Sequence, residues 1–355
     1  MDRRKFVMVS ASTAAALSVP AAIEANAMSR KITAPDQKTD RKPDKKPRRE
    51  DAKPAVVEAP RRNPADCDAI TRDYFDSILL ETRYLDSTLP TTEFKLFGHT
   101  FDTPIMTAAL SHLGNTAPDG MITYAKAAAA CNAVHWVGMG DDDELEQIIA
   151  TGAKSIKIIK PYEDTDLIYH KIEHAVRSGC IAVGMDTDHS FNGSGGYDNV
   201  LGYPMKAKTA EEIASFVKAA GIPFIIKGIL SVNDAVKCLK AGCAGIVVSH
   251  HHGMMPYSVA PLMVIDDIVK AVGGKMKIFV DCGIVSGMDT YKCLASGADA
   301  VSVGRHLMPL LKDGPEAVAD RMRRMTAELA GIMSRTGIPS LDKMDPTVIH
   351  KVPMR

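Results

Sequence analysis

The chain lacks a net charge, has few aromatic side chains and contains no cysteine pattern typical of a disulfide or zinc framework. Its 43 Lys and Arg balance 43 Asp and Glu, and aromatic residues make up 5% of the 355 positions. A neutral balance gives no electrostatic reason to expect nucleic acid or an acidic surface as a partner. With 46% hydrophobic and 24% charged residues, the composition is that of a soluble globular protein with a large core.

Cysteine is present without a recognisable pattern. The 7 cysteines are an odd number, and their spacing matches neither a zinc site nor a disulfide framework. Most of them lie within apolar stretches, which favours buried free thiols over bridges. Cys282 differs, because it follows Asp281 in a loop where a side chain can approach a ligand.

Residues 1–27 have the layout of an export signal. Arg3-Arg4-Lys5-Phe6 is followed by an apolar stretch over 7–23 and by Ala25-Asn26-Ala27, a small-residue cleavage site. The arginine pair is typical of the twin-arginine route, while an ordinary secretory signal or an uncleaved anchor has a similar layout. We therefore expect export to the periplasm or cell envelope of a bacterium, by a route that carries folded proteins with their cofactors.

Residues 28–64 are rich in Lys, Arg, Asp and Pro and have few large apolar residues. Such a segment cannot bury enough apolar surface to fold alone, so we predict a disordered charged linker. The remaining residues, 65–355, are predicted to form one domain.

Within 65–355, apolar strand patterns alternate with helix patterns. Strands are predicted over 104–110, 133–139, 155–161, 180–186, 223–230, 245–250, 277–283 and 300–305, each followed by a helix. This alternation predicts an α/β fold, a (β/α)8 TIM barrel. We expect 72–101 to cap the floor of the barrel, and the polar loop over 187–208 to act as a lid on the opposite, active face.

Polar side chains stand at the ends of the later strands. Lys227 ends one strand, the run from Ser249 to His252 ends the next, and Asp281 and Gly304-Arg305 end the last two. Functional groups at the carboxyl ends of parallel strands mark the active face of such a barrel.

Three motifs give the chain its resemblance to the FMN-dependent α-hydroxy acid oxidase and dehydrogenase family, over roughly 75–337. Lys227-Gly228 looks like the family's Lys-Gly pair, and the stretch from Ser249 to Gly253 looks like its Ser-Asn-His-Gly-Gly. Asp281-Cys282-Gly283 and Gly304-Arg305 look like its two phosphate loops. The resemblance implies FMN as cofactor, held by Lys227, Ser249, Asp281, Gly283, Gly304, Arg305 and Ala108.

The resemblance also assigns catalytic roles. His251 is similar to the family's base, and Asp186 to the carboxylate that stabilises the imidazolium. Lys227 is expected to place a cation near the flavin N1–C2 carbonyl, where negative charge gathers on reduction.

The resemblance breaks at the substrate carboxylate. The family's Arg three residues after the base is Met254 here, and methionine cannot pair with a carboxylate. The family's Gln and Tyr on strand three correspond to Lys157 and Ile159 here. The family's second phosphate Arg is replaced by Val285. The family's N-terminal helix is expected to be absent. We therefore expect a substrate other than a standard α-hydroxy acid. Candidate substrate residues are Lys157, His189, His250, His252, Met254 and Tyr257.

Three consecutive histidines raise the question of a metal. Adjacent side chains on a strand point to opposite faces, so only His250 and His252 would converge, and no further ligand pattern lies nearby. We predict no metal site.

The leading hypothesis is an exported FMN-dependent oxidoreductase that acts on a hydroxyl- or amine-bearing carbon of a small molecule. The electron acceptor is left open among oxygen, a quinone and a cytochrome. The alternatives are an FMN- or phosphate-binding carrier or sensor without turnover, and an FMN-dependent isomerase or inosinate dehydrogenase related to this family. A homo-oligomer is expected by resemblance only.

Overall fold

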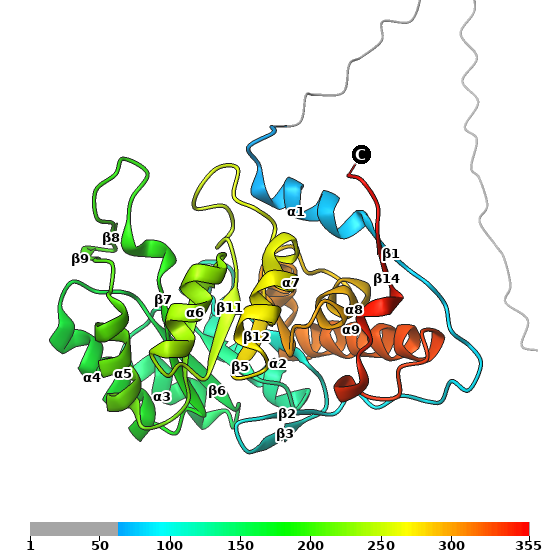
Figure 1. Ribbon diagram of the computed structural model, residues 1–355. Helices are drawn as coiled ribbons and strands as arrows, with labels where there is room; N and C mark the ends of the chain where they lie inside the picture. The colour runs from blue at the N-terminus through cyan, green and yellow to red at the C-terminus, as the bar shows by residue number, and fades with distance from the viewer. Residues whose placement is uncertain (1–62, 355) are drawn as a thin grey trace, which may run out of the picture. The chain divides into compact units, whose positions relative to one another are not determined.

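The computed structural model describes residues 63–354, and its centre is a barrel of parallel strands. The 8-stranded sheet runs in the order β4-β13-β12-β11-β10-β7-β6-β5. The two outer strands meet as well, because the Thr107 N–H donates to the Val134 carbonyl at 3.2 Å and Leu110 bridges Val137 in parallel. The sheet therefore closes, and the predicted (β/α)8 barrel is confirmed (Figure 1). Its strands are β4 (Ile105–Thr107), β5 (His135–Val137), β6 (Ser155–Ile159), β7 (Ala182–Asp186), β10 (Phe224–Ile229), β11 (Gly245–Val248), β12 (Lys277–Val280) and β13 (Ala300–Val303).

A helix follows each barrel strand and packs against the outside. Polar caps fix where these helices begin: the Thr209 hydroxyl accepts from the Glu212 N–H while the Glu212 carboxylate accepts from the Thr209 N–H. Gly221 ends the same helix in the left-handed conformation that glycine favours. The helices are α2 (Gly120–Ala130), α3 (Asp142–Ala150), α4 (Thr165–Arg177), α5 (Ala210–Ala220), α6 (Val232–Lys240), α7 (Pro261–Val272), α8 (Gly287–Ala295) and α9 (Pro315–Arg335).

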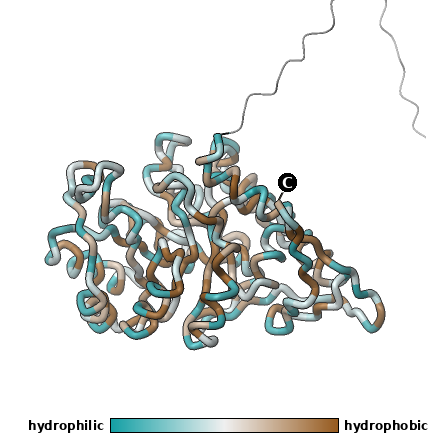
Figure 2. Tube along the Cα trace, turned by 45° about the horizontal axis from the view of Figure 1, so that its top comes forward, coloured by the Kyte–Doolittle hydropathy of each residue, from teal (hydrophilic) through white to brown (hydrophobic). Residues whose placement is uncertain are grey.

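Large apolar side chains fill the barrel. The rings of Trp136 and Phe279 meet edge to face with centroids 5.4 Å apart, and the Trp136 Nε1 lies 3.3 Å from the Met106 Sδ. The hairpin of β2 (Phe94–Leu96) and β3 (His99–Phe101) packs Phe94 and Phe101 against this cluster. The hairpin therefore closes the floor of the barrel. Hydrophobic residues lie mainly along the strands, and hydrophilic residues lie mainly in the loops (Figure 2).

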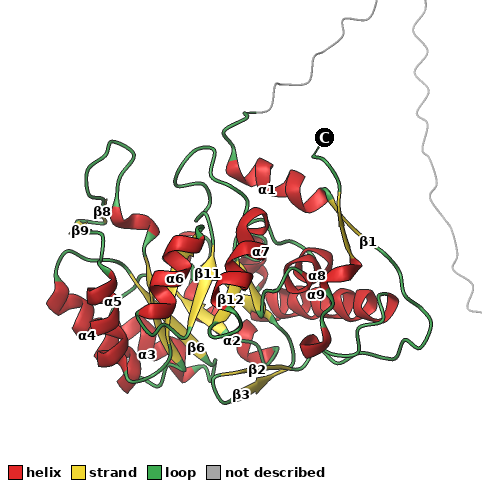
Figure 3. Cartoon of the chain, in the orientation of Figure 1, coloured by secondary structure: helices red, strands yellow, loops and turns green. Residues whose placement is uncertain are grey.

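The expectation that all of 72–101 caps the floor was wrong. Helix α1 (Cys67–Asp76) lies over the other end of the barrel, beside the loop that leads into α7 (Figure 3). The Thr71 hydroxyl lies 2.8 Å from the His250 Nε2, and Asp68 pairs with Arg305. Helix α1 is held by polar contacts to the loops after β11 and β13, and the expected absence of the family's N-terminal helix stays a prediction.

The loop over 187–208 is folded. It begins with η2 (Asp188–Ser190) and contains a short hairpin of β8 (Asn199–Val200) and β9 (Tyr203–Pro204). Within it, the Phe191 and Tyr197 rings stack 5.5 Å apart. The loop stands on the same face of the barrel as α1 (Figure 1).

The remaining elements are a two-stranded sheet and several short turns. Strand β1 (Ile78–Leu80) pairs antiparallel with β14 (Ile349–Lys351). Short 3-10 turns are η1 (Leu113–Asn115), η3 (Met308–Asp313), η4 (Leu341–Lys343) and η5 (Pro346–Val348). No helix in the described residues is long and apolar enough to cross a membrane. The predicted signal over 1–27, and all of the predicted linker except its last two residues, lie outside the described residues.

Candidate active site

Two adjoining hollows open at the carboxyl ends of the barrel strands. The first, here called the long cavity, has a volume of about 440 Å³ and is lined by Lys227, Asp281, Gly283, Gly304 and Arg305 among others. The second, here called the side chamber, has a volume of about 350 Å³ and is lined by Lys160, Asp186, His189 and Leu201 among others. His251 lines both, so it stands where the two hollows meet.

Lys227 lies at the centre of this face, at the carboxyl end of β10. Its Nζ lies 3.3 Å from the Ser249 Oγ, 3.5 Å from Asp281 and 3.7 Å from Asp188. Burial alone would lower the pKa of Lys227, but Asp281, Asp186 and Asp188 together raise it. Lys227 therefore stays charged, and it is the cation that makes a buried group of carboxylates tolerable.

His251 is held by carboxylates on one side of its ring. Its Nδ1 lies 3.2 Å from Asp186 Oδ2 and 2.9 Å from Asp188 Oδ2. Because carboxylates only accept hydrogen bonds, Nδ1 carries the proton of the neutral imidazole and Nε2 keeps a lone pair. Burial would lower the pKa of His251, but the hydrogen bonds to Asp186 and Asp188 outweigh it and raise the pKa.

Asp188 has no counterpart among the sequence predictions. It lies in η2, two residues after Asp186, and its side chain is 11% exposed. Burial and the nearby Asp186 raise the pKa of Asp188. No signal in a single sequence distinguishes this carboxylate from a loop aspartate, since only the turn after β7 brings it back to His251.

Lys160 is the second side chain that the sequence predictions missed. It follows β6, and its Nζ forms an ion pair of 2.7 Å with Asp186 Oδ2 inside the side chamber. The predicted candidate Lys157 lies elsewhere: its Nζ donates to the Gly138 carbonyl at 2.6 Å, and it lines neither hollow. Burial lowers the pKa of Lys157 to about 8. The rule that functional groups stand at the carboxyl ends of strands favours Lys160, which comes after the strand, over Lys157 within it.

His189 also lines the side chamber. Its ring meets the His251 ring edge-on with centroids 4.9 Å apart, and its Nδ1 lies 2.9 Å from Asp198 Oδ2. Burial and then Lys160 lower the pKa of His189. The 187–208 loop thus supplies a neutral ring beside the candidate base.

The other predicted substrate residues do not line the side chamber. Strand β11 ends at Val248 and His251 and His252 take positive φ, so the alternating geometry assumed for the three histidines was wrong. His250 contacts Thr71, and His252 pairs with Asp68 at 2.8 Å beside the long cavity. Met254 and Tyr257 are 42% and 64% exposed and line neither hollow.

The long cavity has the features of a phosphate cradle. A Cβ at Gly283, which has φ +72°, would come within 2.8 Å of the Thr71 methyl, and one at Gly304 within 3.2 Å of Ala108, so both positions leave little space for a side chain. Arg305 lines the cavity, with its guanidinium bound by both Asp68 oxygens at 2.7 and 2.8 Å. Arg72 from α1 lines it too. This arginine, which the sequence analysis did not predict, supplies a cation in a cavity where Val285 replaces the family's second phosphate Arg.

Asp186, His189 and His251 offer ligand atoms within 4.8 Å of one another, a spacing that suits a metal ion. In the described chain each of the three already has a polar partner: Lys160 for Asp186, Asp198 for His189 and Asp188 for His251. The absence of a metal site stays a prediction.

The match to known proteins covers the whole barrel. Residues 65–210 and 200–351 match the family described as FMN-dependent dehydrogenase. The chain belongs to this family. A peroxisomal (S)-2-hydroxyacid oxidase of Arabidopsis thaliana is 28% identical over 286 residues, 70% of this chain and 78% of that protein.

Two further relatives extend the comparison. An L-lactate oxidase of Roseobacter sp. (strain GAI101) is 37% identical over 145 residues, 40% of this chain and 39% of the oxidase. A solved mandelate oxidase variant with (S)-mandelic acid is similar with a TM-score of 0.73 at 25% identity, covering 81% of this chain and 90% of that one.

The family and the cavity agree on the cofactor. The long cavity offers a glycine cradle beside two arginines for a phosphate and a buried lysine at the barrel axis for an electron-rich ring. FMN is therefore the cofactor, and the protein is an FMN-dependent oxidoreductase of the hydroxy-acid-oxidase type.

Proposed function

We propose that this enzyme oxidises a hydroxyl- or amine-bearing carbon of a small molecule held in the side chamber, with His251 as base. The observation that carries the proposal is the state of the His251 ring: two carboxylates hold Nδ1–H, and the remaining nitrogen is free to accept a proton. Asp186 and Asp188 then stabilise the imidazolium that forms. FMN, when bound, supplies the acceptor for the two electrons.

The cofactor is held by residues of the long cavity and by Ser249, which lies beside Lys227. Lys227, Ser249 and Ala108 would contact the flavin ring, and Asp281 would lie between the ring and the phosphate. Gly283, Gly304 and Arg305 serve the phosphate, with Arg72 as a further cation. Lys227 balances negative charge that gathers on the ring as it accepts electrons, because a fixed cation in a buried site is strongly felt.

The substrate differs from a standard α-hydroxy acid held by an arginine. None of the described residues that line the side chamber is an arginine, and the charge of its lysine, Lys160, is offset by Asp186. Apolar side chains make up much of the rest of the wall: Ala109, Leu110, Met139, Ile158, Val200 and Leu201. A substrate with an apolar body and a single polar reacting group suits this wall.

The enzyme acts outside the cytoplasm, exported by the twin-arginine signal over 1–27. Its acceptor is oxygen, a quinone or a cytochrome of the cell envelope. Fractionation of a bacterium that makes the full chain tests export: replacement of Arg3 and Arg4 by Lys is expected to retain the protein in the cytoplasm.

Anaerobic titration of the FMN-loaded protein tests the activity. Hydroxy acids, amines and alcohols are added in turn while the flavin absorption bands are followed. The proposal expects bleaching with an alcohol or amine that lacks an α-carboxylate. Bleaching by α-hydroxy acids alone would overturn the substrate class, and no bleaching with any reductant class would favour a carrier or an isomerase.

A further inference from the structure

Two carboxylates reach the same nitrogen of His251, but they are not equally free to serve it. Asp186 Oδ2 accepts from the Lys160 Nζ at 2.7 Å, and its Oδ1 accepts from the Asp188 N–H at 3.3 Å. Asp188 lies closer to His251, with Oδ2 at 2.9 Å from Nδ1, and its nearest cation, Lys227, is 3.7 Å away. The shorter contact therefore comes from the carboxylate with the weaker competing partner.

The backbone at Gly228 makes room for Asp188. Gly228 has φ +96°, and a Cβ built there would overlap the carboxylate of Asp188. Only glycine allows this close approach, so the Lys227-Gly228 pair places both a cation and a space at the end of β10. Asp188 thus occupies a prepared position and is not a loop side chain that happens to fold inward.

The charged surroundings of His251 come from several elements. Asp186 ends β7, Asp188 and His189 belong to η2, Lys227 belongs to β10, and Asp281 follows β12. Lys227 faces Asp281 at 3.5 Å as well as Asp188, so Lys227, the two carboxylates and the protonated His251 carry no net charge without Asp186. Lys160 and Asp186 form a pair of their own at the chamber wall.

We propose that Asp188 is the positioning carboxylate of His251, and that Asp186 mainly holds Lys160 in the side chamber. This inference rests on His251 being the base of the proposed function. The two aspartates have unequal shares: Asp188 fixes the tautomer and gives most of the stabilisation of the imidazolium, while Asp186 also orients an ammonium group whose other N–H donors are available to a substrate oxygen. Hydrogen bonds to Asp186 and to Asp188 both raise the pKa of His251, so the division between them rests on the distances and on the competing partners.

The test is the pKa of the His251 ring, measured by nitrogen-15 NMR in the FMN-loaded full chain. Asp188→Asn is compared with the double variant Asp186→Asn/Lys160→Met, which removes the other pair as a neutral unit. Loss of a carboxylate in contact with an imidazole lowers its pKa by roughly 1–3 units. We expect that tenfold or larger loss of proton affinity in Asp188→Asn, and a smaller loss in the double variant.

An equal or larger shift in the double variant would overturn the inference. If Asp188→Asn does not fold, Gly228→Ala takes its place, because the added methyl displaces the Asp188 carboxylate. Gly274→Ala is the matched control: Gly274 also has positive φ, at +70°, but nothing lies within 4 Å of its Cβ position. Gly228→Ala is expected to lower the pKa of His251 and Gly274→Ala to leave it unchanged; an unchanged pKa in folded, FMN-loaded Gly228→Ala contradicts the inference.

The pKa comparison needs no turnover, so it stands apart from the proposed function. If His251→Asn reduces its flavin with substrate as fast as the unaltered enzyme, the proposed base is wrong while the comparison of the two aspartates remains valid. With a substrate in hand, Asp188→Asn is expected to lower kcat and leave KM nearly unchanged, and the double variant is expected to raise KM. A purely structural role for Asp188 would change FMN content and leave the pH dependence of kcat where it was.

Discussion

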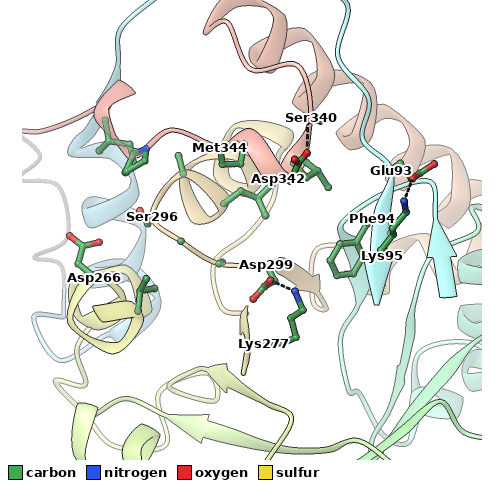
Figure 4. Close-up of a pocket in the computed structure, with 18 of the residues that line it drawn as sticks. Glu93, Phe94, Lys95, Asp266, Lys277, Ser296, Asp299, Ser340, Asp342 and Met344 are labelled. Carbon is green, nitrogen blue, oxygen red and sulfur yellow. Dashed lines mark hydrogen bonds and ion pairs between the residues drawn. The ribbon is translucent and has the colours of Figure 1, made fainter. Parts of the chain in front are cut away.

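The barrel has a cavity at the amino ends of its strands and two at the carboxyl ends, and their volumes do not indicate which end holds the active site. A hollow of about 1080 Å³ lies at the amino ends of the strands, around β2, α7, α8 and the residues near β14 (Figure 4). The hollows at the carboxyl ends measure about 440 and 350 Å³. Volume alone would therefore select the wrong end.

The charges separate the two ends. In the large hollow, Lys277 pairs with Asp299 at 2.6 Å and Lys95 with Glu93 at 3.3 Å, and these side chains reach solvent. At the active face, Lys227 is buried, and the carboxylates of Asp186, Asp188 and Asp281 surround it. Buried charges that shift one another's pKa values are expensive and gather where chemistry needs them.

Replacement of a lysine at each end gives the largest expected contrast. Lys227→Met leaves buried carboxylates without their cation, so we expect a loss of about 3–5 kcal/mol in the free energy of unfolding and a loss of bound FMN. Lys277→Met removes a partly exposed pair and is expected to cost less than about 1 kcal/mol. Urea unfolding of both variants measures this, and equal losses would remove the distinction between the ends.

Two lysines near β6 give a smaller contrast. Lys160→Met removes the cation of the side chamber and leaves Asp186 unpaired, so we expect KM to rise by roughly tenfold, the effect of one lost charge-assisted hydrogen bond. Lys157→Met removes a donor to the Gly138 carbonyl outside both hollows and is expected to leave KM unchanged. Steady-state kinetics of the FMN-loaded variants checks both, and a rise in KM for Lys157→Met alone would reverse the assignment.

The pH dependence follows from His251. Asp186 and Asp188 raise its pKa above the ordinary value of 6.5, and the ring must be neutral to accept a proton. We therefore expect kcat/KM to fall as the pH drops through that raised pKa. The stability that charged His251 contributes has the opposite trend: it is fully present below the unfolded pKa and is lost as the pH rises through the folded pKa. Profiles of kcat/KM and Tm against pH test both signs, with His251→Asn as the control for the Tm trend.

The smallest expected effect belongs to the contact between α1 and the phosphate cradle. Asp68 binds Arg305 and His252, but all three side chains are partly exposed. Asp68→Asn is therefore expected to change the Kd for FMN by less than about fivefold, the range of a surface ion pair. Fluorescence titration of the apoprotein with FMN measures this, and complete loss of binding would give α1 a larger role than its contacts indicate.

The barrel could be predicted because each of its elements carries a local signal. Thr209 with Glu212 and Gly221 mark the two ends of α5, and the apolar run from Phe224 to Ile229 marks a buried strand. Lys227, Asp281 and Gly304 could be placed because they end such strands.

The rest of the site depends on turns that local patterns do not fix. Asp188 returns to His251 only through η2 and the space at Gly228, and Thr71 of α1 contacts His250, which lies 179 residues further along the chain. His251 and His252 left the predicted strand geometry because they adopt positive φ after β11 ends. Tertiary contacts offset that backbone strain, and no periodicity in the sequence predicts it.

Rapid-mixing measurement of anaerobic flavin reduction in the unaltered enzyme and in His251→Asn, matched for FMN content, tests the account most directly. With a substrate that bleaches the unaltered enzyme, loss of a general base is expected to slow bleaching by roughly 10²–10⁴-fold while FMN remains bound. Bleaching of His251→Asn at the unaltered rate would contradict the assignment of His251 as base.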